Sequence, residues 1–203
     1  MFKKLSIICF LVVSIHSYSQ LRTGILVGGG IGLEQNLSVN KNNTEFLKGV
    51  QFKDTYLYNV LLGYRFRFEN QSHKNLFFDI DPLLKLQTFK SSDFEPGNTN
   101  DYTSVTKEAH YLNFQLAVSA SANYKIFKEL YVGLGIEPTW NIVTDGKPFD
   151  IPILGKIGYN FNNKVDISLT YRQGFTNTIN DSKYSKGRTS DIYLSIFIPF
   201  TVR

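Results

Sequence analysis

Strict alternation of apolar and polar residues is the feature that most constrains this chain. In the segment HYLNFQLAVSASANYKIF, which spans residues 110–127, every second residue from Leu112 to Tyr124 is apolar or aromatic. The residues between them are polar, with the single exception of Ala117. A period of two predicts a β-strand with one apolar face and one polar face. The alternation alone does not decide whether the apolar face points into a soluble core or outward into lipid.

The same alternation recurs along the chain and predicts eight strands. They span residues 21–33, 55–68, 76–89, 110–127, 130–143, 149–161, 164–173 and 190–200. Short connections follow the second, fourth and sixth strands, whereas the connections 34–54, 90–108, 144–148 and 174–189 are longer. Short and long connections therefore alternate, which predicts an antiparallel meander with all short turns at one end and all long loops at the other.

Two prolines interrupt this pattern. Pro82 lies inside the third predicted strand and Pro138 inside the fifth. Because proline cannot donate a ladder hydrogen bond, we expect a local bulge at each position.

Four observations favour a barrel whose apolar face contacts lipid. Outer-membrane barrels alternate short turns with long loops, and most of the predicted strands exceed the 9–11 residues that cross a bilayer. The polar face carries Gly, Ser, Asn and Gln with charges of both signs, and Tyr and Phe lie near the ends of the apolar faces. The sequence therefore predicts an all-β fold, an eight-stranded antiparallel up-and-down transmembrane β-barrel. The alternative is a secreted lipocalin-like barrel with an apolar pocket.

The alternation also assigns residues to the two faces. We expect Leu116 near the bilayer midplane, because it lies near the middle of its strand. The residues expected to face lipid are Leu112, Phe114, Leu116, Val118, Leu169, Leu194 and Ile196. The charges expected to face the lumen are Arg65, Arg67, Asp79, Asp81, Lys85, Glu137, Lys156, Asp166 and Arg172.

These inward charges have two interpretations. They could line a selective pore, or they could form a packed plug of salt bridges and hydrogen bonds, since charges removed from water must pair. An eight-stranded barrel is just wide enough to be filled by side chains, which favours the plug.

The first 19 residues read as a cleaved secretory signal peptide. Lys3 and Lys4 precede an apolar core from Leu5 to Val13, and Ser17 and Ser19 match a signal-peptidase site before Gln20. The expected mature domain is residues 20–203, at the cell outer membrane. Loss of the two lysines would lower the formal net charge from +5 to +3, and no basic run suggests nucleic acid. The only cysteine, Cys9, lies within the leader, so no disulfide or Cys-based metal site is expected.

Candidate chemistry elsewhere is weak. The stretch GGGIG at residues 28–32 matches neither nucleotide-binding template, and glycines facing a narrow lumen or allowing a strongly coiled strand explain it better. His110 with Ser104 or Ser119 could imitate the His and Ser of a lipid-modifying barrel, while His73 lies in a short turn. No signature supports that pairing, and no ligand cluster suggests a metal. We therefore predict no enzyme activity and no cofactor.

The chain resembles a known family in several segments. The leader ends in Ser-x-Ser followed by Gln20, and YNVLLGYRF, GLGIEPTW, IPILGKIGYNF, ISLTYRQGFTN and an alternating final strand follow. These segments are similar to the small outer-membrane barrel domain of Gram-negative bacteria, specifically the PorT-like group among OmpA-like barrels. The resemblance covers nearly the whole mature chain and implies an accessory role in a protein export complex.

Two classes of function follow. The first is a structural or interaction barrel that contacts the outer-membrane bilayer and binds other envelope proteins through its long polar loops, because loops carry binding functions more often than scaffolds do. The second is a small transport pore or a lipid-modifying outer-membrane enzyme.

Overall fold

The computed structural model describes residues 20–33, 38–39, 55–69, 74–95, 105–142, 148–162, 164–176, 184–186 and 188–202. Residues 1–19 and most residues of the longer connections lie outside these ranges. Within them, no helix is both long and apolar enough to cross a membrane.

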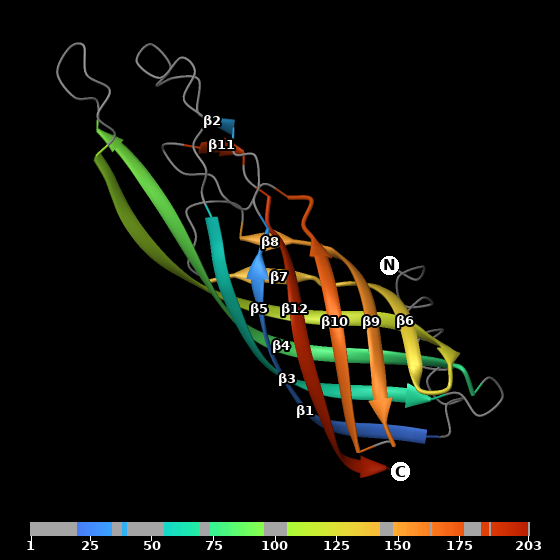
Figure 1. Cartoon of the computed structure of the whole chain (residues 1–203). Coiled ribbons are helices and arrows are strands. Elements are labelled where there is room, and N and C mark those ends of the chain that lie inside the picture. Colours follow the sequence, from blue (N-terminus) through green and yellow to red (C-terminus); the bar gives the residue numbers. More distant parts are fainter. Residues whose placement is uncertain are drawn as a thin grey trace, which may run out of the picture.

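The described residues form a closed antiparallel barrel (Figure 1). The strand β1 (Gln20–Gly32) pairs with both β3 (Thr55–Glu69) and β12 (Ser190–Val202), so the last strand closes on the first. Around the wall the order continues through β4 (Leu76–Glu95), β5 (Val105–Phe127), β6 (Leu130–Ile136), β9 (Ile153–Phe161) and β10 (Val165–Gln173). Two short segments, β7 (Thr139–Asn141) and β8 (Phe149–Asp150), continue β6 and β9 towards the long-loop end. The predicted fold of eight antiparallel strands is confirmed.

Tight turns connect the strands at one end of the barrel. Lys128 in the β5–β6 turn and Asn162 in the β9–β10 turn have φ values of 46° and 48°. These left-handed conformations are uncommon outside glycine, and asparagine tolerates them better than most residues. We call this the short-turn end and the opposite one the long-loop end.

The connection between β4 and β5 differs from the prediction. Residues 90–108 were expected to be loop, but the two strands stay paired up to Glu95 opposite Val105. The pairing of β3 with β4 ends at Lys90, so β4 and β5 continue beyond it as a two-stranded ribbon at the long-loop end (Figure 1). The same end holds a second unpredicted pairing, between β2 (Ser38–Val39) and β11 (Tyr184–Lys186). Both pairs lie in polar stretches without a periodic apolar face, which is why alternation missed them.

The bulges expected at the two prolines are absent. Gly63 pairs with Leu83 and Phe66 with Ile80, so β3 and β4 keep one register across Pro82. On the other side of β4, Pro82 is directly opposite Val118. Pro138 does interrupt a strand, since β6 ends before it and β7 begins after it, but both segments pair with β5 in the same register. Each proline therefore costs the sheet one ladder hydrogen bond, and no extra residue is inserted into its strand.

The register fixes the tilt of the strands. A row of direct cross-strand partners leaves β4 and returns to it ten residues further along, passing through Leu76, Tyr124, Val132, Ile157, Leu169, Leu194, Gly29, Val60 and Leu86. A shear of ten over eight strands corresponds to a tilt of about 40°. Each residue then advances about 2.5 Å along the barrel axis, and each strand crossed along the row about 3 Å.

Side chains alternate between the two sides of the wall as predicted. On β5, for example, Leu116 and Val118 are exposed on the outside while Gln115 and Ser119 are buried inside. Aromatic residues form two outer girdles about 25 Å apart along the axis by the register above. The lower girdle, at the short-turn end, contains Phe68, Tyr124, Phe161 and Phe200. The upper girdle, towards the long-loop end, contains Tyr58, Phe114, Trp140 and Phe149.

Candidate functional site: the barrel interior

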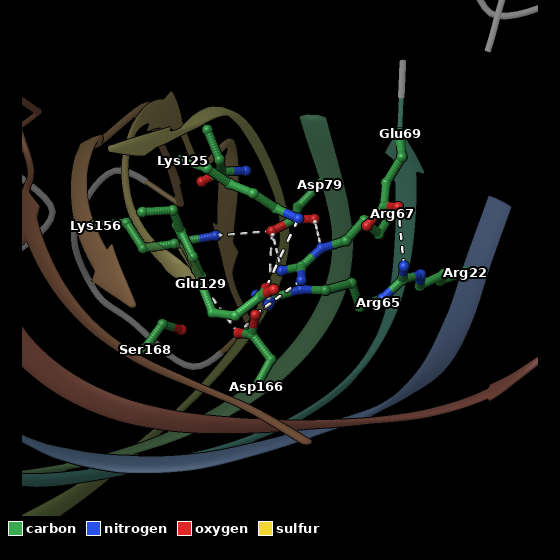
Figure 2. Close-up of polar contacts among 12 residues, drawn as sticks. Arg22, Arg65, Arg67, Glu69, Asp79, Lys125, Glu129, Lys156, Asp166 and Ser168 are labelled. Carbon is green, nitrogen blue, oxygen red and sulfur yellow. Dashed lines mark hydrogen bonds and ion pairs between the residues drawn. The ribbon is translucent and has the colours of Figure 1, made fainter. Parts of the chain in front are cut away.

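Six charged side chains from four strands form a cluster near the short-turn end, which we call the lower cluster, and Figure 2 labels all of them except Asp81. Their strands bring together residues that are up to 101 positions apart in the sequence. All are buried, and they are Arg65, Arg67, Asp79, Asp81, Lys156 and Asp166.

The two arginines of the lower cluster hold the three carboxylates. Arg65 donates two hydrogen bonds to Asp81, each 2.8 Å long, and Arg67 donates two to Asp79, at 2.7 and 3.0 Å. Asp166 lies between the arginines, 2.8 Å from Nη1 of Arg67 and 3.5 Å from Nη1 of Arg65. Bidentate pairs of this kind fix both partners geometrically and are among the stronger hydrogen bonds in proteins.

Neighbouring groups complete this cluster. Lys156 lies 3.5 Å from Asp79 and donates to the Ser121 hydroxyl at 3.0 Å. The Tyr131 hydroxyl donates to Asp166 at 2.7 Å. The Arg67 guanidinium also lies over the Phe77 ring, 4.4 Å from its centroid. The cations therefore have both carboxylate and aromatic partners.

A second cluster, the upper cluster, lies nearer the long-loop end and consists of Lys85, Glu137, Arg172 and Asp191. Nζ of Lys85 is 2.5 Å from Glu137, and Arg172 lies 3.3 Å from Glu137 and 2.9 Å from Asp191. Asn59 donates to the second oxygen of Asp191 at 2.8 Å. By the register, the two clusters are centred about 12 Å apart along the axis.

Charge balances within each cluster. The lower one has three cations and three anions, and the upper one has two of each. All nine charges assigned to the lumen from the sequence lie in these clusters, but that set had one cation in excess. The missing partner is Asp191, which lies in the eighth predicted strand, residues 190–200. Tyr131 and Tyr193, which also bond interior carboxylates, were missed because aromatic residues were expected to point outward.

An apolar layer contributes to the packing of the interior. Six buried residues form one hydrophobic cluster, namely Leu26, Leu61, Leu83, Ala117, Tyr193 and Phe197. By the register, Leu26, Leu61 and Leu83 lie between the centres of the two ion clusters, and Leu61 is the direct partner of Lys85. The described interior is thus layered, with charges at two levels and leucine side chains between them.

The outer wall has the opposite character. Of the residues expected to face lipid, Leu112, Phe114, Leu116, Val118, Leu169 and Leu194 are exposed, and Ile196 is partly exposed on the same face. The register corrects one detail: Leu116 lies about 9 Å above the centre of the apolar belt, not at its midplane. β5 extends far beyond the belt at the long-loop end, so the middle of the strand is not the middle of the belt. An apolar outside around a charged inside is the arrangement of a transmembrane β-barrel.

Comparison with known proteins agrees with this fold. The outer membrane protein OprG from Pseudomonas aeruginosa, in its crystal structure, is similar to this chain with a TM-score of 0.50 and 12% sequence identity. The similarity covers 89% of this chain and 92% of OprG. No family model matches the chain, and no curated protein matches its sequence. The chain has the fold of an eight-stranded outer-membrane barrel.

The remaining candidate residues do not form a catalytic site in the described structure. His110 and Ser119 are both on β5, nine residues apart, which is about 30 Å along a strand, so this pair is excluded. Ser104 and His73 lie outside the described residues. Gly28 and Gly30 face the lumen, as predicted, and an added Cβ at either position would overlap carbonyl oxygens of β12. Among the described residues, no three His, Cys, Asp or Glu side chains gather as metal ligands.

Proposed function

We propose that this protein is an outer-membrane β-barrel with a sealed interior that acts as a structural or interaction protein and not as an open channel. The observation that carries the proposal is the pairing of every charge in the two interior clusters. A conducting lumen needs hydrated charges or free space along its axis. Here the charged side chains of both clusters are at most 3% exposed.

The energetics support a stable seal. Removing one partner of a buried ion pair leaves an uncompensated charge, at a cost of about 3–5 kcal/mol. Opening the lumen would require separating several such pairs together. The leucines between the clusters add a second barrier, because hydrophobic constrictions exclude water and ions.

The surface left for function is the long-loop end. The four longer connections lie at this end, and the pairing of β2 with β11 joins the first of them to the last. We propose that this end binds other envelope proteins. An accessory role in a protein export complex rests on the sequence resemblance, and affinity capture of the intact protein from outer membranes tests it.

Conductance measurements test the seal. The purified mature protein, reconstituted in planar bilayers, should give no large, steady channels under conditions in which a known porin conducts. Heat-modifiable migration on gels shows beforehand that the protein has folded. Reproducible large openings by the folded protein would contradict the sealed interior and favour the pore.

A further inference from the structure

The outer wall contains a furrow where one side chain is missing from the apolar belt. Gly155 faces outward on β9, and nothing lies within 4 Å of the position that its Cβ would occupy. Its direct partners on the neighbouring strands are Leu134 and Tyr171. Leu134 stands out from the wall with 72% of its surface exposed. The furrow has a volume of about 770 Å³, and Ala122, Ile157 and Leu169 also line it.

We propose that this furrow binds one acyl chain of an anionic phospholipid from the leaflet at the short-turn end. Gly155 lies about 15 Å along the axis from the foot of β9, so it is close to the centre of the belt. Half of a hydrocarbon core is also about 15 Å thick. An acyl chain whose headgroup lies at the short-turn interface would therefore end beside Gly155.

The short-turn ends of β6 and β9 supply positive charge that can bind a lipid phosphate. β6 pairs with β9, and the turns that precede β6 and follow β9 contain Lys128 and Lys164, both exposed. Glu129 is the one acidic residue in the sequence of these two turns, and its carboxylate lies 3.8 Å from Nζ of Lys125. The two lysines thus flank the furrow at headgroup depth, which favours an anionic headgroup over a zwitterionic one.

The inference rests on the bilayer location in the proposed function, and its test separates the two. Native mass spectrometry would count lipids retained by the folded protein after reconstitution with phosphatidylglycerol or phosphatidylcholine. The wild type should retain one phosphatidylglycerol in preference to phosphatidylcholine. Gly155→Leu should lower this retention about fivefold, or about 1 kcal/mol. The control is Gly29→Leu, at another outward glycine whose Cβ would meet the Asn59 carbonyl oxygen at an ordinary 3.4 Å.

A second pair of variants tests whether the lysines recognise the lipid headgroup. Lys164→Glu should remove the preference for phosphatidylglycerol, whereas Arg188→Glu, an exposed position at the long-loop end, should leave it unchanged. Heat-modifiable migration confirms folding of each variant, and Gly155→Ala replaces Gly155→Leu if the larger residue prevents folding. Equal retention by the Gly155 and Gly29 variants would overturn the proposal, as would a dimer in place of the lipid adduct. A protein that fails to enter vesicles at all would instead contradict the bilayer location.

Discussion

Two outward leucines of equal exposure but different depth provide the sharpest mutational test of the barrel's placement. Leu194 on β12 is 50% exposed and Leu116 on β5 is 51% exposed. By the register, Leu194 lies within about 2 Å of the centre of the apolar belt, whereas Leu116 lies about 9 Å above it. Arginine at Leu194 would place a charge in the middle of the hydrocarbon. Arginine at Leu116 can extend its guanidinium to the upper interface.

The two substitutions should therefore differ in cost. An arginine on the lipid face costs about 2–4 kcal/mol at the midplane and about 0–1 kcal/mol near the interfaces. We expect Leu194→Arg to lower the free energy of unfolding by about 2 kcal/mol more than Leu116→Arg. Alanine at the same two positions measures the loss of the leucine itself, and subtracting that loss isolates the effect of the charge.

Reversible unfolding by denaturant in lipid vesicles measures all four variants. If Leu116→Arg costs as much as Leu194→Arg, the depths of the two leucines derived from the strand register are wrong. If neither arginine costs more than its alanine counterpart, the outer face does not contact lipid.

Three further predictions concern the interior, the closure of the barrel and the leader. Asp166→Asn removes the carboxylate held by Arg67 and should cost about 3–5 kcal/mol in the same unfolding assay. Glu129→Gln, at the more exposed pair with Lys125, should cost about 1 kcal/mol or less, and equal costs would argue against a buried lower cluster. Gly30→Ala forces a Cβ against the backbone of β12 and should cost about 1–3 kcal/mol, whereas the adjacent Gly29→Ala should be tolerated; the reverse order would contradict the pairing of β1 with β12. The intact mass of protein purified from outer membranes should correspond to a chain that begins at Gln20, and a mass that includes residues 1–19 would exclude cleavage there.

The alternation in the sequence was sufficient for the fold and for the side of the wall on which a residue lies. In β5 the polar residues Gln115 and Ser119 are inside and the apolar Leu116 and Val118 are outside, because a strand has only two faces. Depth could not be derived in the same way. It depends on how each strand is shifted against its neighbours, and that shift arises from contacts between distant segments. For this reason the sequence placed Leu116 at the bilayer midplane, whereas the register places it above the centre of the apolar belt.

The interior was predicted less completely than the wall. Charge balance would have found Asp191, since the predicted set contained an unmatched cation. Alternation places Tyr131 and Phe77 inside, but the aromatic residue types alone did not indicate a role there. Their contacts show it: Phe77 lies under the Arg67 guanidinium, and the Tyr131 hydroxyl donates to Asp166.

Fluorescence of the single tryptophan tests most directly whether the apolar wall faces lipid. Trp140 is outward and 54% exposed, and it lies in the upper aromatic girdle, about 12 Å from the centre of the belt. In vesicles of brominated lipids, bromine near the headgroup end of the acyl chain should quench Trp140 strongly, and bromine at the chain terminus should quench it weakly. Quenching by neither lipid, together with strong quenching by aqueous acrylamide, would contradict the membrane-embedded barrel.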